Sequence, residues 1–219
     1  MTIYTESAYN SSAMAETFTK ERFDFLDSES ANLRYVIAAH HLRDCDYVIE
    51  IGGRKIGDFL THNPKITLII DPLFDQQYVK YGKDSSYIAH VPKFYQDYDF
   101  SHILEREGTK GLVLLGFMLK RELTQEGKND DLEKLKELFT GMDVVILDTM
   151  IRDTAGYRNF LEAVKLAEEC GLTKVMERKT ETMIDTSYEG AQAYKVTKPR
   201  HYFLFRRYDL AALGEDDPI

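Results

Sequence analysis

The segment over residues 46–71, DYVIEIGGRKIGDFLTHNPKITLIID, constrains the fold more than any other part of the chain. It contains two apolar runs, YVIEI and ITLII, that are rich in β-branched residues and long enough for one buried strand each. Gly52 and Gly53 follow the first run at once, where the chain must turn sharply and another group can approach the backbone closely. A short amphipathic stretch, stopped by Asn-Pro, predicts a helix before the second run. Strand, glycine turn, helix and strand in this order predict the nucleotide-binding half-unit of a doubly wound α/β sheet.

Asp71 stands directly after the second apolar run, 19 positions beyond Gly52. A carboxylate about 20 residues after the glycine turn is the group that binds a ribose in such units. We therefore expect Asp71 to bind the ribose of a cofactor, and a solvated strand end or helix cap is the alternative. Glu50, directly before the glycines, does not fit the nicotinamide fingerprint, which favours a different nucleotide cofactor.

The rest of the chain extends this unit into a larger sheet. Further apolar runs predict strands at residues 86–91, 111–115 and 143–147. The segments between them predict an aromatic-rich loop and helix at 94–106, a long helix at 118–139 with a break at 127–129, and a helix at 157–170. The alternation predicts an α/β fold with a doubly wound, mostly parallel, Rossmann-like sheet and helices on both faces. The last two runs, at 172–178 and 201–205, have no helical crossover between them and predict an antiparallel C-terminal strand pair.

Two segments are harder to place from the pattern. Residues 74–81 are expected to form a short helix or loop. Residues 1–45 are expected to form a helical lid segment packed on the core, and residues 46–219 a single globular domain.

Composition limits the partners. The formal net charge of −9 argues against a protein that holds nucleic acid electrostatically. The two cysteines, Cys45 and Cys170, have no metal-type spacing, and they are expected to be buried apolar residues in a reducing compartment. The N-terminal residues lack a secretory signal, and no apolar run approaches the roughly 18 residues that a membrane span needs. We expect a cytoplasmic protein that binds a small-molecule substrate, with no membrane and no nucleic-acid partner.

Five parallel strands followed by an antiparallel pair resemble the layout of class I S-adenosylmethionine-dependent methyltransferases over nearly the whole chain. The run VIEIGG at residues 48–53 is similar to the first motif of that family, in which an acidic residue ends the first strand and a glycine turn meets the methionine part of the cofactor. Asp71 resembles the acidic residue that accepts hydrogen bonds from both ribose hydroxyls, a task that suits the two oxygens of a carboxylate.

The resemblance implies S-adenosylmethionine as the cofactor and assigns further residues. Pro72 and Leu73 would lie beside the adenine, His90 and Val91 would read its amino group, and Gly116 and Phe117 would face the transferable methyl. The implied cofactor-binding residues are Glu50, Gly52, Gly53, Asp71, Pro72, Leu73, His90, Val91, Gly116 and Phe117, and those of the substrate pocket or lid are Tyr9, Asp148 and Arg152.

The chain departs from the family pattern in three places. The usual acidic residue after the third strand is absent, so the adenine would be held by backbone and by His90. Arg54, Lys55 and Ile56 replace the spaced glycines of the first motif, so the loop follows another path or its basic pair meets a carboxylate. The fourth motif lacks an Asp/Asn-Pro-Pro-aromatic signature, which argues against methylation of amino groups in DNA or of protein amides.

Several candidates have a structural alternative of equal or greater weight. Tyr9 is either a lid residue that contacts the sulfonium or simple packing, and Phe117 is either core or a wall near the sulfonium. Asp148 and Arg152 either line the substrate rim after the fifth strand or cap a helix. His40 and His41 lack a second ligand cluster, and we expect one ring inside and one outside on a helix.

The function that this pattern favours is methyl transfer from S-adenosylmethionine to a small molecule, with no identified catalytic base. One alternative keeps the cofactor and changes the reaction. The amino group of the cofactor then attacks the cofactor's own side chain, which forms azetidine-2-carboxylate and releases methylthioadenosine. The same pattern is also compatible with a nucleotide-binding protein without turnover and, less well, with a nicotinamide-dependent reductase.

Overall fold

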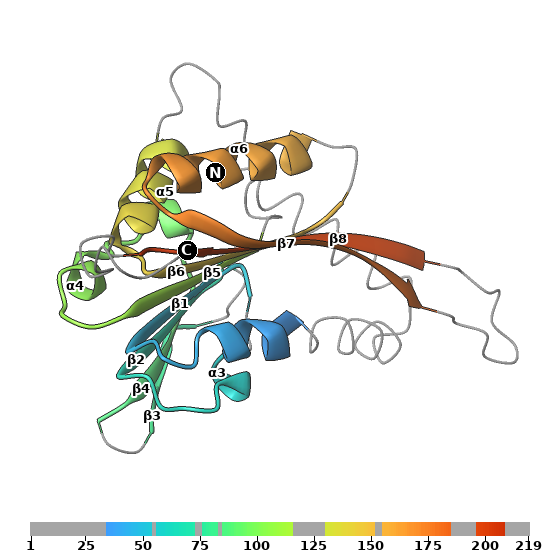
Figure 1. The fold of residues 1–219 in the computed structure, drawn as a ribbon. Helices are drawn as coiled ribbons and strands as arrows, with labels where there is room; N and C mark the ends of the chain where they lie inside the picture. The colour runs from blue at the N-terminus through green and yellow to red at the C-terminus, as the bar shows by residue number, and fades with distance from the viewer. Residues whose placement is uncertain are drawn as a thin grey trace, which may run out of the picture.

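The computed structural model describes residues 34–53, 56–72, 76–82, 85–115, 130–151, 155–184 and 196–208. These residues form one eight-stranded sheet with helices packed against it (Figure 1). The strands are β1 (Tyr47–Ile51), β2 (Ile66–Ile70), β3 (Tyr78–Tyr81), β4 (Tyr87–Val91), β5 (Lys110–Leu115), β6 (Val144–Met150), β7 (Thr173–Ile184) and β8 (Val196–Arg206). The helices are one over residues 34–41, α3 (Ile56–Phe59), the 3₁₀ helix η1 (Tyr95–Asp97), α4 (Ser101–Leu104), α5 (Asp130–Gly141) and α6 (Ala155–Glu169).

The strand order confirms the predicted fold class. It runs β3-β4-β2-β1-β5-β6-β8-β7. The five strands from β4 to β6 in this order are parallel, whereas β8 is antiparallel to both β6 and β7. The central strands are continuous apolar runs because both of their faces are covered.

Two hydrophobic cores lie on opposite faces of the sheet. Along β1, Tyr47, Ile49 and Ile51 pack into the core that α5 and α6 cover, while Val48, between Tyr47 and Ile49, packs into the core beneath the helix over residues 34–41. This alternation follows from the two-residue period of a strand. Figure 1 shows α4, α5 and α6 on one side of the sheet and α3 with the 34–41 helix on the other.

The prediction of a helix or loop over residues 74–81 was wrong for β3. This strand pairs antiparallel with β4 at the edge of the sheet, and all four of its residues are exposed. Its sequence, YVKY, has the aromatic and β-branched content of a strand, but an exposed edge strand shows no alternation between buried and exposed positions. The pattern of burial therefore gave no signal there.

The antiparallel pair is longer than its apolar runs predicted. β7 and β8 remain paired as far as Ile184 and Val196, whereas the pairing of β6 with β8 stops at Met150 and Arg200. The hairpin thus continues beyond the carboxyl end of β6, as the long arm on the right of Figure 1.

Arg207, just after β8, connects the ends of two helices. Its guanidinium donates hydrogen bonds to the carbonyls of Phe139 and Met142 at the end of α5 and to that of Cys170 after α6, at 2.8 to 3.2 Å. Unpaired carbonyls at a helix end need such donors.

The predicted glycine cap of the 157–170 helix is confirmed. Gly171 has a φ of 81°, and its N–H donates to the carbonyl of Glu168 while the N–H of Leu172 donates to that of Ala167. These two bonds form a Schellman motif, which requires the left-handed conformation at this position.

Replacement of Gly171 by Ala should lower the free energy of unfolding by about 1–2 kcal/mol, because a Cβ is strained at positive φ. The new Cβ would also lie 3.2 Å from Nη1 of Arg207. Urea denaturation measures the change, with Glu169→Ala as a control at the end of the same helix. Equal midpoints for Gly171→Ala and the wild type would contradict the cap.

Candidate functional site

The chain reverses its direction of winding at β1. It moves outward from β1 to β2 and β4, and then returns to place β5 on the other side of β1. In open α/β sheets, ligands bind at the carboxyl ends of the strands beside such a switch point. The residues that follow β1, β2 and β4 are therefore the candidate site.

Backbone hydrogen bonds bring these residues together. The N–H of Gly52 donates to the carbonyl of Ile70 (2.9 Å), and the N–H of Asp71 donates to the carbonyl of Val91 (3.2 Å). The glycine turn, Asp71 and the end of β4 thus lie side by side at the carboxyl ends of the parallel strands.

The structure explains why both positions of the turn are glycine. Gly52 has a φ of 75°, a conformation that favours glycine. A Cβ on Gly53 would overlap with a carboxylate oxygen of Glu50 and would lie 2.8 Å from the Tyr35 hydroxyl. The sequence predicted a close approach to the backbone here, and the group that approaches Gly53 is the chain's own Glu50.

Glu50 is fully buried and connects β1 to α3. Its Oε2 accepts a hydrogen bond from the N–H of Ile56, at the start of α3 (3.0 Å). Burial raises the pKa of the Glu50 carboxyl to about 7, against the opposing effects of the Ile56 amide and the Tyr35 hydroxyl. The carboxyl group therefore changes its charge close to neutral pH.

Asp71 is the first residue after β2, as predicted, and only 4% of its surface is exposed. Pro72 beside it is half-buried. A ribose would reach the Asp71 carboxylate only where the groups that cover it move aside. Predicted site residues that lie outside the described part of the chain are Tyr9, Leu73, Gly116, Phe117 and Arg152.

His90 and Val91 end β4 instead of following it. Val91 is part of the hydrophobic core, and the His90 ring stacks on Tyr78 of β3 with centroids 4.0 Å apart. The Tyr78 hydroxyl is also hydrogen-bonded to Nε2 of His90 (2.8 Å). Burial lowers the pKa of His90. The unpredicted strand β3 thus occupies one face of this ring, and a role in adenine binding stays a prediction.

Asp148 does not follow the fifth parallel strand but lies within it, because β6 continues to Met150. Its buried carboxylate accepts two hydrogen bonds from Arg200 of β8, one of them at 2.9 Å, and lies 3.8 Å from Arg34. A buried carboxylate needs such partners. The strand predicted to end at residue 147 therefore continues for three more residues, since a paired charge within a strand looks like a boundary in the sequence. A small hollow beneath the 34–41 helix adjoins this ion pair, lined by Arg34, Tyr35, Ala38, Val113, Ile146, Asp148 and Tyr202.

The strand order decides the fold. Parallel strands in the order β4-β2-β1-β5-β6, followed by antiparallel β8 and β7, have the layout that the sequence was found to resemble. The chain thus has a Rossmann-like α/β fold with the strand order of class I methyltransferases. The additional strand β3 extends the sheet beyond β4.

Solved structures with this fold are similar to the chain at low identity. Precorrin 8w decarboxylase from Methanobacterium thermoautotrophicum is 10% identical, with a TM-score of 0.48 over 81% of this chain and 89% of that one. Precorrin-6y C5,15-methyltransferase from Geobacter metallireducens is 10% identical, with a TM-score of 0.47 over 80% and 87%. A candidate RNA methyltransferase from Pyrococcus horikoshii is 11% identical, with a TM-score of 0.44 over 80% and 81%. At these values no activity transfers from the neighbours to this chain. No protein-family model and no curated protein matches the sequence.

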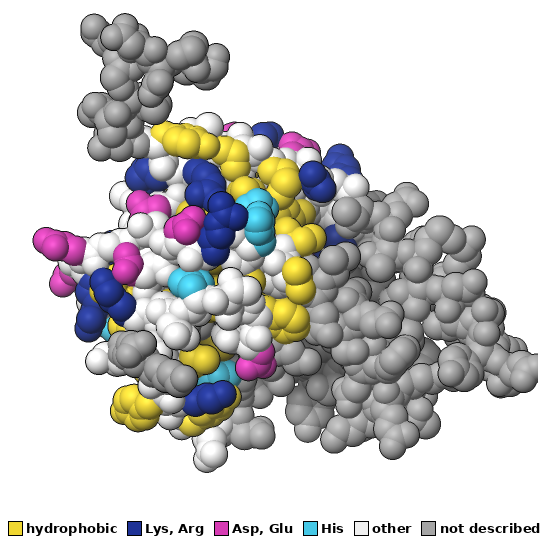
Figure 2. All heavy atoms as spheres, turned by 60° about the horizontal axis from the view of Figure 1, so that its bottom comes forward, with side chains coloured by type: hydrophobic (Ala, Val, Ile, Leu, Met, Phe, Trp, Pro, Cys, Tyr) yellow, Lys and Arg dark blue, Asp and Glu magenta, His cyan; other side chains and the backbone are white. Residues whose placement is uncertain are grey.

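The described part of this fold holds no group of three side chains that could bind a metal ion. His40 is exposed and His41 is half-buried, which confirms the expected helix-face pair. The rings of His40 and His41 pack edge to face, with centroids 5.2 Å apart. Figure 2 shows the molecule with the bottom of Figure 1 turned forward, where histidine side chains lie among hydrophobic and charged ones. In the same residues, no helix is long and apolar enough to cross a bilayer.

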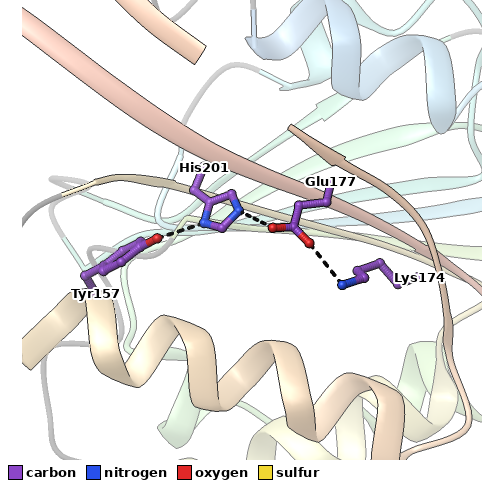
Figure 3. A network of polar contacts seen from close by, with 4 residues as sticks. All are labelled: Tyr157, Lys174, Glu177 and His201. Atoms are coloured by element: carbon purple, nitrogen blue, oxygen red, sulfur yellow. Dashed lines mark hydrogen bonds and ion pairs between the residues drawn. The ribbon is translucent and has the colours of Figure 1, made fainter. Parts of the chain in front are cut away.

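Sequence reasoning missed one polar network, shown in Figure 3. Nδ1 of the buried His201 on β8 is 2.9 Å from the Tyr157 hydroxyl of α6, and its Nε2 is 3.0 Å from Oε1 of Glu177 on β7. Lys174 donates to the other oxygen of Glu177 (3.0 Å). The partners of His201 are 24 and 44 residues away in the sequence, so no local motif could have connected them.

Glu50→Gln should make stability less dependent on pH. The folded pKa of Glu50, about 7, exceeds the ordinary 4.5, so the wild-type residue contributes stability below pH 4.5 that is lost as the pH rises through about 7. The neutral Gln still offers an acceptor to the Ile56 amide. Wild-type stability should therefore fall relative to Glu50→Gln by up to about 3 kcal/mol between roughly pH 5 and pH 8.

Urea denaturation across this pH range measures the difference, and Glu107→Gln, at an exposed glutamate, serves as the control. Parallel pH profiles for Glu50→Gln and the wild type would mean that Glu50 titrates normally.

Proposed function

We propose that the protein is an S-adenosylmethionine-dependent enzyme that transfers a methyl group to a small molecule. The observation that supports this most is the hydrogen bond from the Gly52 N–H, in the turn after β1, to the carbonyl of Ile70, which places that turn beside Asp71 at the switch point of the sheet. In the family that the chain resembles, two such features bind the methionine and ribose parts of the cofactor.

The residues present have the chemistry that this cofactor needs. The two carboxylate oxygens of Asp71 can accept hydrogen bonds from a vicinal diol. In the family that the chain resembles, a glycine turn at this place meets the methionine part, and the negative charge of Glu50 above about pH 7 favours a cationic ligand nearby. Residues assigned to the adenine, methyl and lid regions on the resemblance alone are Pro72, Leu73, His90, Val91, Gly116, Phe117, Tyr9, Asp148 and Arg152.

The bound cofactor would supply a methyl group on a positively charged sulfur, which is already a strong electrophile. The protein then has to hold the acceptor in line with that methyl group and to exclude water. The acidic net charge of −9 supports a small-molecule acceptor over a nucleic acid. The two free cysteines support a cytoplasmic location.

Calorimetric titration with S-adenosylmethionine, followed by chromatography of the incubated sample, tests the proposal. Binding with formation of S-adenosylhomocysteine on addition of an acceptor supports methyl transfer. Release of methylthioadenosine would instead show cyclisation or lyase chemistry, binding without turnover would show a binding protein, and the absence of binding would refute the assignment.

Asp71→Ala should weaken S-adenosylmethionine binding by about 1–3 kcal/mol, the cost of losing charge-assisted hydrogen bonds. Calorimetry measures the dissociation constant, and thermal denaturation shows whether the variant remains folded. Asp44→Ala is the matched control, because this aspartate has a 76% exposed side chain in the turn before β1. Unchanged affinity in a folded Asp71→Ala variant would remove the ribose assignment.

A further inference from the structure

We propose that Tyr157, His201 and Glu177 form a proton relay that takes the proton of a hydroxyl acceptor. This inference rests on the proposed function and deepens it, because it narrows the acceptor to alcohols and phenols. The three side chains come from α6, β8 and β7, and they form a continuous line of hydroxyl, imidazole and carboxylate (Figure 3).

The hydrogen bonds fix the direction of the relay. The Glu177 carboxylate only accepts, so Nε2 of His201 carries the proton and donates it at 3.0 Å. Burial lowers the pKa of His201 below its ordinary 6.5, and the ring is therefore neutral at pH 7. Its Nδ1 is then an acceptor, and the Tyr157 hydroxyl donates to it at 2.9 Å. Burial and the nearby Glu177 raise the pKa of Tyr157, which keeps this donor protonated.

The charges around the ring suit a proton acceptor. Glu177 keeps its charge because hydrogen bonds from Lys174 and His201 lower its pKa. The negative carboxylate stabilises the imidazolium that forms when Nδ1 accepts a proton, while Lys174 and Lys179 on β7 act in the opposite sense. The ionisable groups that face His201 are thus Glu177, Lys174 and Lys179 from β7 and Tyr157 from α6.

The relay lies near the carboxyl ends of the parallel strands, as the candidate cofactor site does. His201 pairs with Thr149, one residue before the carboxyl end of β6. Tyr157 stands in the first turn of α6, which begins at Ala155 after β6. β8 is separated by β6 alone from β5. The resemblance implies that the residues after β5 face the transferable methyl. Two strand spacings amount to about 10 Å.

A second Tyr–His pair in the same chain shows what a simpler contact looks like. Tyr98 and His102 are 3.3 Å apart, and Nδ1 of His102 is 3.0 Å from the backbone carbonyl of Asp99. A backbone carbonyl is enough to satisfy a histidine, and it brings no charge. His201 instead has a carboxylate that a lysine holds in place. Such a carboxylate orients a general base and stabilises its protonated form.

The proton balance of the step closes within these groups. The acceptor hydroxyl passes its proton to the Tyr157 oxygen as the Tyr157 proton moves to Nδ1 of His201. The acceptor oxygen forms its new bond to the methyl group as the bond from that carbon to sulfur breaks, and the electron pair stays on a neutral thioether. The imidazolium then releases one proton to water.

Phenylmethanesulfonyl fluoride tests the relay without any knowledge of the acceptor. The Tyr157 oxygen forms a bond to sulfur, fluoride leaves, and the phenol proton passes to His201. Peptide mass spectrometry of the full-length protein should show Tyr157 modified about 100-fold faster than Tyr98, the scale of general-base assistance. The rate should fall as the pH drops through the pKa of His201, which burial places below the ordinary histidine value.

Three variants separate a relay from a structural contact. His201→Gln should slow the modification of Tyr157 about 100-fold, and the conservative Glu177→Gln, at a 40% exposed side chain, about tenfold. His102→Gln should leave it unchanged. Nitrogen-15 NMR of the wild type should show the Nε2–H tautomer of His201, and thermal denaturation monitors folding.

Equal reactivity of Tyr157 and Tyr98, or a Glu177→Gln rate equal to the wild type, would overturn the relay. A different result would refute the proposed function. If S-adenosylmethionine does not bind, the protein has no methyl donor, but the reactivity of Tyr157 still reports on the proton transfer. Cofactor binding with an unreactive Tyr157 would remove the relay alone.

Discussion

The candidate site depends on the hydrogen bond between the buried carboxyl group of Glu50 and the backbone at the start of α3. The carboxyl group accepts the N–H of Ile56, and Gly53 passes so close to it that no side chain fits there. One group thus fixes the end of β1, the turn and the beginning of the next helix. Because a buried carboxyl without hydrogen bonds is costly, the turn has little freedom to move away from it. The position of the backbone at Gly52 beside Ile70 follows from this arrangement.

The ion pair of Asp148 plays a comparable part on the other side of β1. Its contact with Arg200 joins β6 to β8, and its contact with Arg34 joins β6 to the 34–41 helix. Replacement of one partner would leave a buried charge unpaired, which is why such pairs determine how elements fit together more than how stable they are.

The sequence was sufficient for the fold where burial is continuous. β1, β2, β5 and β6 were predicted because strands covered on both faces are unbroken apolar runs. β3 and the outer part of the β7–β8 hairpin were missed or shortened, because pairing between backbones needs no apolar pattern.

The site divides in the same way. Gly52 and Asp71 carry local signals, a glycine turn and a carboxylate at a set spacing, and the structure brings them together. Their role toward a cofactor stays a prediction. The contacts of His201 could not be predicted, since they exist only once β8 has paired with β7 and α6 has packed on the sheet.

The place of β8 in the sheet has a consequence for biosynthesis. β8 is the last described strand along the chain, yet it lies between β6 and β7, and Arg207 behind it holds the ends of α5 and α6. During synthesis the ribosome releases β7 before its neighbour in the sheet exists, and β6 keeps an open edge meanwhile. Completion of this half of the sheet therefore waits for the synthesis of β8, whereas β1, β2, β4 and β5 already have their partners.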